Sequence, residues 1–556
     1  MYLYIPENKG TNTRLAISRI VHGYKDLYAG LFESGSKDGS GSCEKDVACY
    51  PEWETESNAV ALVLLASGTE HCSGSLLNNT AQDFKAYFLT AFHCVDVNEN
   101  NLISPAEENN AENWAFRFKY KKTSCSGSIV ASFYTYNQDY IRAAWNTSDF
   151  ALVELQDSPI KDVAFLGWDR TGSTPTKGTG IHHPSGDVMK ISFDNDVLKE
   201  TSKSSNSGSG YWRTIWDVGA TEPGSSDSPL FDQNKRVVGQ LWGGYSACGA
   251  SDMRDWYGCL YRSWTGGGTN STRLSNWLDP NNTGAQVLNT LYPYITGPTV
   301  VCTSNSTFTL HNRPSGTTVN WTKSTNLRPV SGQGTDNYTV KAYWYSAGQG
   351  WVRATIGGAY YEKHAWVGKP TTDDLDILNP YNFPANTLCE GEQNQLIGNY
   401  SYNTGWLQPT IQDYDWDYGG WSHFEVGATD NISFVTVPYP FTYKDIKLRA
   451  ANQCGESDWI TERFYPNQSC GYFFGFSPNP ADDYVEISPD ESKLAENAID
   501  YYEVRIYNSL NVAVFQTGKT KESLLRINTK QFQNGVYFIH FIAGKKIDVK
   551  QLVVNH

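Results

Sequence analysis

The sequence lacks a long hydrophobic run and is short of basic residues. Its longest uninterrupted apolar stretch, residues 59–66, has eight residues, whereas a membrane-spanning helix needs about 18 or more. The chain has 44 lysines and arginines against 59 aspartates and glutamates, a formal net charge of −15. A nucleic-acid partner would require a basic surface that neutralises phosphates. The composition therefore predicts no transmembrane segment and no nucleic-acid partner.

Methionine is also scarce, with 3 residues, while the chain contains 18 tryptophans and 35 tyrosines. The 48 glycines and 23 prolines favour turns over long helices. No heptad pattern or low-complexity tail is present. A length of 556 residues corresponds to about four domains. We therefore expect an all-β protein with several domains.

The cysteines show no paired spacing of the kind that binds zinc. Their total of 11 is odd, so at least one is unpaired or bonded to another chain. Scattered disulfides indicate export, yet residues 1–10 have neither the basic start nor the apolar core of a signal peptide. Either the chain is cytosolic, or it is a fragment of a secreted protein without its signal peptide. We expect the fragment.

Three short motifs contain the groups that nucleophilic catalysis needs. A serine hydroxyl needs an imidazole to take its proton, and the imidazole needs a carboxylate to fix its tautomer. His93, Asp149 and Ser226 supply these groups in the order His, Asp, Ser. Each alone has a structural interpretation, and their combination in one β region predicts a hydrolase. The motifs are LTAFHC (89–94), TSDFAL (147–152) and EPGSSDSP (222–229).

Further motifs around this triad resemble the lysyl endopeptidase branch of the trypsin-fold serine proteases. The resemblance implies two six-stranded antiparallel β-barrels with the catalytic residues between them, cleavage of protein or peptide substrates after lysine, and no cofactor for catalysis. The motifs are GSGSC (39–43), CSGSLLNNTAQD (72–83), GWDR (167–170), IHHP (181–184), GQLWGG (239–244), SWTGGG (263–268) and RLSNWLDP (273–280).

The resemblance also implies roles for individual residues. The N–H groups of Gly224 and Ser226 would form the oxyanion hole. A buried Asp255 would receive the lysine ammonium of the substrate. The segment Trp242, Gly243 and Gly244 would pair with the substrate backbone.

The same resemblance implies three disulfides and leaves Cys259 as the candidate free thiol. The implied pairs are Cys43–Cys248, Cys49–Cys125 and Cys72–Cys94. The partners of the remaining cysteines cannot be assigned; these are Cys302, Cys389, Cys454 and Cys470.

Two residues beside the nucleophile depart from related patterns. Residue 225 is serine, not the aspartate that trypsin-like zymogens use to capture a new N-terminus. Residue 227 is aspartate where the family has glycine, and a carboxylate beside the oxyanion hole would oppose the charge of the intermediate. The alternative function is therefore a catalytically impaired homologue that acts as a surface adhesin or binding protein. A third is an active protease of other specificity, if Asp255 does not reach the pocket.

An acidic segment just after His93 resembles an EF-hand calcium loop. Residues 96–107 (DVNENNLISPAE) place oxygen-bearing side chains at positions 1, 3, 5, 9 and 12 and isoleucine at position 8. Asn101 replaces the usual glycine at position 6. A structural calcium ion is therefore expected, and a bare acidic loop is the competing interpretation. The candidate ligands are Asp96, Asn98, Asn100 and Glu107.

The C-terminal part resembles modules of proteins exported by type IX secretion. Residues 477–487 (SPNPADDYVEI) and the strands up to residue 554 are similar to a sorting domain. This implies the type IX machinery as a partner and a secreted or cell-surface location. The expected parts are the end of a pro-domain and a linker (1–42), a trypsin-like domain (43–292), two Ig/PKD-like β-sandwiches (297–384 and 385–470) and a small β-sandwich sorting domain (471–556).

Overall fold

The computed structural model describes residues 39–556 except 66–70, 138, 158–159, 381–385, 391–392, 401–408, 468–473, 497, 510–511 and 545. The expected pro-domain end and Cys470 therefore lie outside the described residues, apart from the last linker residues. The chain divides into two compact units. The first comprises Met1–Ile295, Leu310–Trp321 and Arg353–Glu362, and the second comprises the remaining residues.

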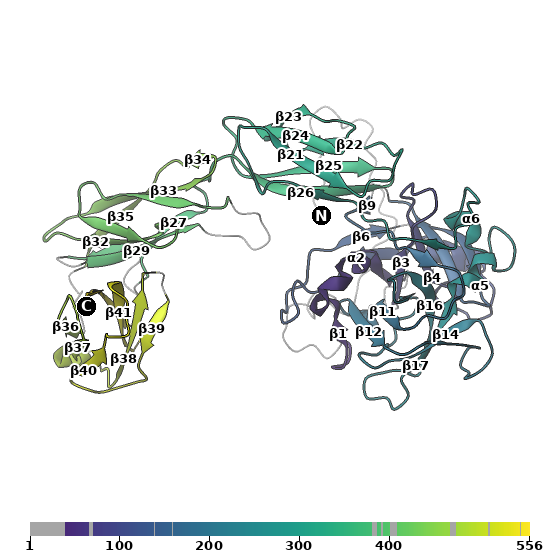
Figure 1. Cartoon of the computed structure of the whole chain (residues 1–556), viewed down its shortest axis with the longest axis horizontal. Coiled ribbons are helices and arrows are strands. Elements are labelled where there is room, and N and C mark those ends of the chain that lie inside the picture. The colour runs from purple at the N-terminus through teal and green to yellow at the C-terminus, as the bar shows by residue number, and fades with distance from the viewer. Residues whose placement is uncertain are drawn as a thin grey trace. The chain divides into compact units, whose positions relative to one another are not determined.

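The first unit contains a seven-stranded antiparallel sheet with the order β6-β5-β2-β3-β4-β8-β7. Figure 1 labels β6, β3 and β4 of this sheet. Strands β2 and β4 are runs of apolar residues that are buried almost throughout, as expected for strands covered on both faces. The strands are β2 (Val60–Leu64), β3 (His71–Leu76), β4 (Tyr87–Ala91), β5 (Ala115–Phe118), β6 (Tyr134–Asn137), β7 (Asp139–Trp145) and β8 (Phe150–Leu155).

A second sheet of ten strands completes the core of this unit. Its main order is β1-β12-β11-β15-β16-β17-β14-β13, with β10 paired to β16 and β18. The strands are β1 (Lys45–Asp46), β10 (Trp168–Asp169), β11 (Gly178–His182), β12 (Lys190–Asp194), β13 (Lys199–Thr201), β14 (Tyr211–Ile215), β15 (Pro229–Phe231), β16 (Val237–Gly244), β17 (Arg254–Cys259) and β18 (Val287–Leu288).

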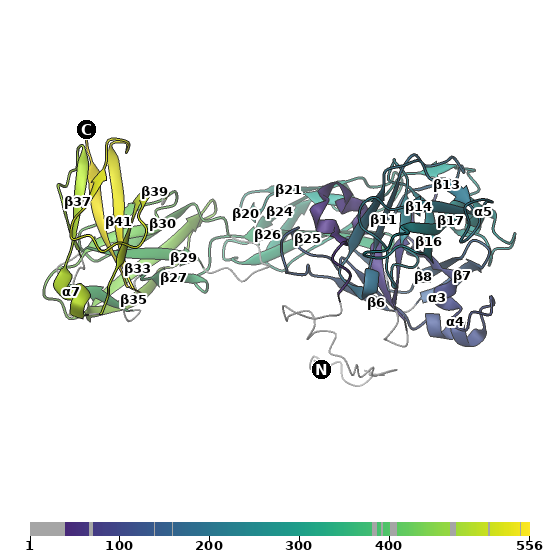
Figure 2. The same cartoon turned by 90° about the horizontal axis from the view of Figure 1, so that it is seen from below.

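Helices in the first unit are short and lie at strand ends. Helix α3 contacts β8, and helix α4 contacts β7 (Figure 2). The two-sheet, trypsin-like fold is the predicted one, although the described sheets have seven and ten strands instead of six each. The helices are η1 (Val47–Cys49), η2 (Pro51–Trp53), α2 (Glu54–Ser57), α3 (Phe92–Val95), α4 (Pro105–Ala111), η3 (Pro184–Gly186), α5 (Leu260–Thr265) and α6 (Ser275–Leu278).

Residues 294–367 contribute to two further sheets, ordered β19-β21-β24-β23 and β20-β26-β25-β22. The short strand β9 (Ile160–Lys161) pairs in parallel with Ala359 and Tyr360 of β26, which is why residues 353–362 belong to the first unit. The strands are β19 (Tyr294–Thr296), β20 (Val300–Val301), β21 (Ser306–His311), β22 (Asn320–Lys323), β23 (Leu327–Ser331), β24 (Asn337–Ala342), β25 (Gln349–Ile356) and β26 (Ala359–Val367).

The next two sheets pack on a shared hydrophobic core, as in a β-sandwich. Their orders are β27-β29-β32-β31 and β28-β35-β33-β30, with β34 beside β33. The strands are β27 (Leu375–Leu378), β28 (Thr387–Cys389), β29 (Gln393–Tyr400), β30 (Asp413–Asp417), β31 (His423–Val426), β32 (Ile432–Thr436), β33 (Lys444–Asn452), β34 (Gly455–Glu456) and β35 (Ile460–Asn467).

The last two sheets enclose a separate core made by residues between 474 and 554. Their orders are β36-β37-β40 and β39-β38-β41-β42. The all-β fold class is thus confirmed, while the domain boundaries stay a prediction. The elements are β36 (Phe474–Ser477), β37 (Tyr484–Pro489), α7 (Glu491–Glu496), β38 (Tyr502–Asn508), β39 (Ala513–Gln516), β40 (Leu525–Asn528), β41 (Gly535–Ala543) and β42 (Lys546–Val554).

Candidate active site

Strand pairing brings His93 and Asp149 together. Strands β4 and β8 pair in antiparallel register with Ala91 opposite Phe150, so the residues that follow β4 meet those that precede β8. His93 Nδ1 lies 2.8 Å from Asp149 Oδ2, and the His93 backbone N–H donates to Asp149 Oδ1 at 3.1 Å. Asp149 is buried. The carboxylate therefore holds the imidazole with Nδ1 protonated and leaves Nε2 for chemistry.

The electrostatics of this pair favour a charged imidazole. Burial alone lowers the pKa of His93, but the Asp149 carboxylate outweighs this effect, with a smaller contribution from Asp227. The net pKa of His93 is raised to about 9. An imidazole must be neutral to accept a proton, so this environment opposes its use as a base near neutral pH.

Ser226 and Gly224 lie in the loop between β14 and β15. Gly224 has φ +94°, a conformation that glycine adopts without strain. Ser73 of β3 fixes the loop, because its hydroxyl donates to the Gly224 carbonyl at 2.9 Å and its N–H donates to the Ser226 carbonyl at 2.8 Å. Within the described residues, the N–H groups of Gly224 and Ser226 have no recorded acceptor. Both are therefore available to an oxyanion.

His93, Asp149 and Ser226 line one open cavity of about 640 Å³. No hydrogen bond joins Ser226 to His93 in the described part of the chain. Such contacts are often loose in an unliganded protease and tighten with substrate. The cavity lining also includes the predicted substrate-binding residue Trp242, and Asp96 from the acidic segment.

The residue before the candidate nucleophile is held by a histidine that the sequence alone did not implicate. The Ser225 hydroxyl lies 2.7 Å from His182 Nδ1 and accepts the Glu222 N–H at 3.0 Å. On its other side, His182 Nε2 lies 3.1 Å from Ser192 Oγ, whose hydroxyl donates to the Ala220 carbonyl. Burial lowers the pKa of His182 to about 3, so the ring is neutral. The only signal in the sequence is the IHHP motif.

Asp255 is completely buried on β17, opposite Gly244 of β16. Its Oδ2 accepts from Trp216 Nε1 at 2.5 Å, Thr221 Oγ1 at 2.8 Å and Ser246 Oγ at 2.7 Å. Burial raises the pKa of Asp255, although these donors partly offset the effect.

The second oxygen of Asp255 is less engaged. Oδ1 accepts one long hydrogen bond, from the Ser246 N–H at 3.4 Å. A Cβ added to Gly244 would lie 2.1 Å from this oxygen, so glycine is needed there. Asp255 is not part of the cavity that contains His93.

Trp242 has a cationic neighbour that the sequence did not predict. The Lys203 ammonium lies 4.1 Å from the centre of the Trp242 ring, and both residues line the cavity. This distance is typical of a cation–π interaction. The following residue, Gly243, has φ +147° and no atom within 4 Å of an added Cβ. The backbone of Gly243 and Gly244 is thus open to close approach on one side.

The Asp227 carboxylate contacts Thr90 and lies close to His93. Its Oδ2 accepts from the Thr90 hydroxyl at 2.8 Å, and one of its oxygens lies within 4.8 Å of a His93 ring nitrogen. Its φ of +73° is the left-handed conformation that glycine usually takes. This backbone conformation directs the side chain inward, where it is 1% exposed.

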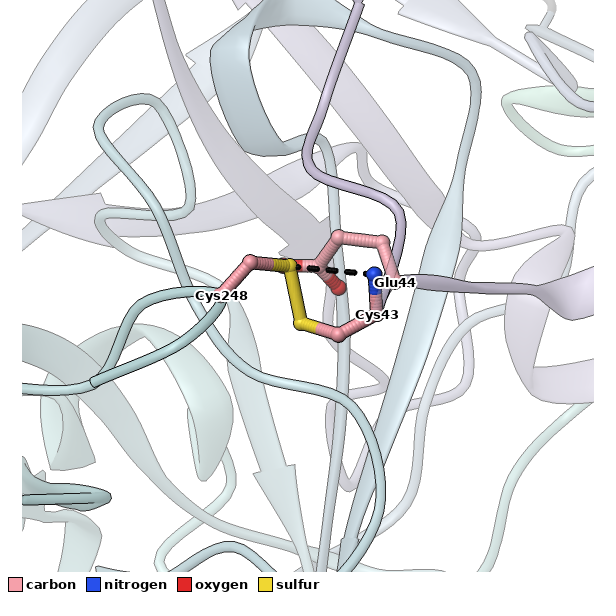
Figure 3. Close-up of side chains that lie close together, drawn as sticks. All are labelled: Cys43, Glu44 and Cys248. Carbon is pink, nitrogen blue, oxygen red and sulfur yellow. Dashed lines mark hydrogen bonds between the residues drawn. A yellow bond between two sulfur atoms is a disulfide. The ribbon is translucent and has the colours of Figure 1, made fainter. Parts of the chain in front are cut away.

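The structure contains the three disulfides implied for this unit, and Cys259 is buried and free. It also joins Cys302 to Cys454, a pair the sequence left open. Figure 3 shows the bond between Cys43 and Cys248 with the Glu44 side chain beside it. Burial raises the pKa of Glu44 to about 8.

The acidic segment 96–107 begins after α3 and ends in α4. Asn101 has φ +65°, the left-handed conformation that position 6 of a calcium loop requires. Asp96 accepts the N–H groups of Asn100 at 3.1 Å and Asn101 at 2.8 Å, and Glu107 forms a capping box with Ser104.

The donors in this segment are oxygen atoms, which suit a hard cation such as calcium. Asn98 takes part in the same turn, because its side-chain oxygen accepts the Asn100 N–H at 3.1 Å. Calcium binding stays a prediction, since these hydrogen bonds also form in a bare acidic loop.

Comparison with protein families assigns two segments of the chain. Residues 37–258 match the model of the lysyl endopeptidase C-terminal domain. Residues 476–555 match the secretion system C-terminal sorting domain. Both resemblances drawn from the sequence are confirmed. The sorting domain and the protease relatives establish a secreted or cell-surface protein. No helix among the described residues is long and apolar enough to cross a membrane.

The curated proteins that are similar to this chain include a lysyl endopeptidase and karilysin. Lysyl endopeptidase of Pseudomonas aeruginosa is 28% identical over 283 residues, 46% of this chain and 57% of that protein. Karilysin of Tannerella forsythia is 25% identical over 286 residues, 47% of this chain and 58% of that protein. The chain thus spans less than two thirds of either relative.

Solved structures give weaker likenesses. The crystal structure of Deg5 has a TM-score of 0.25 and 12% identity, covering 37% of this chain and 86% of that chain. The MamO protease domain from Magnetospirillum magneticum has a TM-score of 0.24 and 12% identity, covering 37% and 93%. These likenesses are too distant to identify a function.

Proposed function

We propose that the protein is a secreted serine endopeptidase that cleaves on the carboxyl side of lysine. The observation that carries the proposal is the Asp149–His93 pair in one cavity with Ser226. Two N–H groups next to Ser226 have no recorded acceptor among the described residues. The segment that holds these groups lies within the match to the lysyl endopeptidase model.

In the proposed mechanism, His93 Nε2 takes the proton of the Ser226 hydroxyl as its oxygen attacks the scissile carbonyl. Asp149 stabilises the imidazolium that forms. The N–H groups of Gly224 and Ser226 donate to the oxyanion of the tetrahedral intermediate. His93 then returns the proton to the leaving amine, and water hydrolyses the acyl-enzyme by the same steps. No metal or cofactor is needed in this sequence.

Preference for lysine is proposed from Asp255. A buried carboxylate whose Oδ1 accepts one weak hydrogen bond can receive an ammonium group. A lysine side chain in the substrate has the length and the charge for this contact. An uncharged substrate side chain would leave the carboxylate without a cation.

A fluorogenic lysyl peptide tests the activity, with full-length Ser226→Ala protein as the control. We expect turnover by the wild-type chain and a loss of at least about 10³-fold in the variant, because the nucleophile is gone. A fluorophosphonate probe should label the wild type at Ser226 and leave the variant unlabelled. The proposed protease activity would be disproved if wild-type turnover did not exceed that of the variant and Ser226 stayed unlabelled at every pH between 6 and 10.5.

The second candidate function is a catalytically impaired homologue that binds a partner at a surface. The observation in its favour is Asp227, a second buried carboxylate next to His93. The labelling experiment separates the two functions, because an impaired homologue leaves Ser226 unlabelled over the whole pH range.

A further inference from the structure

Asp227 belongs to a buried cluster of three titratable groups. One ring nitrogen of His93, one carboxylate oxygen of Asp149 and one carboxylate oxygen of Asp227 all lie within 4.8 Å of one another. Asp149 is 4% exposed and Asp227 is 1% exposed. The triad as derived from the sequence contains one carboxylate, whereas the structure places two next to the imidazole.

The second carboxylate is only partly satisfied. Its Oδ2 accepts from Thr90, but its buried Oδ1 has no hydrogen-bond partner among the described residues. An ionised carboxylate in such a site needs a cation close by. The His93 imidazolium is the positive group nearest to it in the cluster, because Thr90 is neutral and Asp149 is an acid.

Other charged groups face the cluster from the open side. Lys203, which lies after β13, lowers the pKa of His93 slightly. Asp96 and Glu99 line the same cavity from the acidic segment. Asp96 is 3% exposed, but its carboxylate accepts the N–H groups of Asn100 and Asn101. Glu99 is exposed to solvent. The acids that raise the pKa of His93 are therefore Asp149 and Asp227.

The protonation of His93 and of Asp227 is therefore coupled. One proton lies on His93 or on Asp227, and the loss of this proton from both groups would leave buried carboxylates with no cation beside them. Burial raises the pKa of Asp227 to about 7, and the proximity of His93 limits the rise. His93 and Asp227 titrate as a coupled pair, with apparent values that belong to the pair.

We propose that Asp227 is a positioning residue for the His93–Asp149 pair. The Asp227 carboxylate keeps the shared proton on the His93 imidazole, so that the imidazole becomes neutral, and able to act as the general base, only at alkaline pH. The proposal rests on the proposed protease function for its catalytic consequence. It requires no new bond, only that the resting imidazole is charged over the neutral range.

The pH dependence of kcat/KM tests the proposal in the full-length protein. Asp227→Asn removes the charge and keeps the volume, and Asp227→Gly also removes the side chain at a position with φ +73°. We expect both variants to lower the apparent pKa of the acidic limb by about one unit or more. Activity at pH 7 should then rise about tenfold for each unit.

A matched control is Asp139→Asn, which removes another buried carboxylate of the first unit. Asp139 begins β7 and has no recorded contact with the three-residue cluster. Its substitution should leave the acidic limb where the wild type has it. A limb that moves with Asp227→Gly but not with Asp227→Asn would show an effect of volume, and the proposal would be wrong.

The ionisation of His93 can be measured without turnover. In the Ser226→Ala background, the ring of ¹⁵N-labelled His93 is titrated by NMR and assigned with a His93→Gln variant. We expect its apparent pKa to fall when Asp227→Asn is added. An unchanged value overturns the proposal, whether or not the wild type is active. If the apparent pKa of His93 falls but the wild type shows no turnover, the proposed role of Asp227 is supported and only the proposed protease activity is rejected.

Discussion

The proposed lysine preference depends on one carboxylate, so Asp255→Asn is the sharpest test of it. The substitution removes the negative charge and nearly preserves the shape. The three donors to Oδ2 remain satisfied by the amide oxygen, because Trp216, Thr221 and Ser246 all donate to a single atom. The side chain should therefore stay in place, and the loss should be electrostatic.

The expected magnitude follows from the burial of Asp255. Removing one partner of a buried charge pair costs about 3–5 kcal/mol, and about 1.4 kcal/mol corresponds to a factor of ten in rate. A lysine substrate that meets an amide in place of the 0% exposed carboxylate should lose about 10²- to 4 × 10³-fold in kcat/KM. A substrate with uncharged norleucine at the same position should lose almost nothing or improve.

The assay compares lysine, arginine and norleucine peptides that share all other residues. Asp252→Asn is a matched control, because Asp252 lies three residues away and forms a surface ion pair with Arg254. Norleucine cleavage reports whether the variant is folded. If Asp255→Asn still prefers lysine to norleucine within threefold of the wild type, Asp255 does not bind the substrate and the reasoning fails.

The remaining predictions concern the calcium loop and a buried acid. Calcium should release heat on titration into the wild type but not into Glu107→Gln. The exposed neighbour Glu108 provides the control, and Glu108→Gln should release the same heat as the wild type. No heat with the wild type would rule out the site. Burial raises the pKa of Asp139 to about 8, above its unfolded value, so folding stability falls as pH rises from about 4 through 8. Asp139→Asn should remove this slope and stabilise the first unit at pH 9 by a few kcal/mol, on the order expected from such a difference. Calorimetric unfolding temperatures between pH 5 and 9 measure it, and an equal slope in both proteins would contradict the assignment.

Much of the candidate site could be predicted from residue types and their local spacing. The motifs around His93, Asp149 and Ser226 name the groups that we propose transfer protons, because that chemistry depends on which side chains are present. The alternation of the C-terminal strands predicted β structure, and the motif at residues 477–487 gave the resemblance to a sorting domain. These features are local in the chain, so they can be read without coordinates.

Contacts distant in the sequence could not be obtained in this way. The bond between Cys302 and Cys454 spans 152 residues. The Lys203 ammonium lies over the Trp242 ring because the loop after β13 meets strand β16 at the cavity. His182 of β11 contacts Ser225 in the loop before β15. No local pattern encodes such distances, because strand pairing across the sheets determines them.

Asp227 shows which information came from the sequence and which came from the tertiary structure. The sequence by itself determined that a carboxylate replaces glycine beside the candidate nucleophile, and it also indicated the candidate acid–base residues and the sorting domain. Only the tertiary structure decided that this carboxylate is buried against Thr90 and close to His93. The physical reason is that a left-handed φ of +73° at residue 227 and the position of Thr90 on β4 bring the two side chains together.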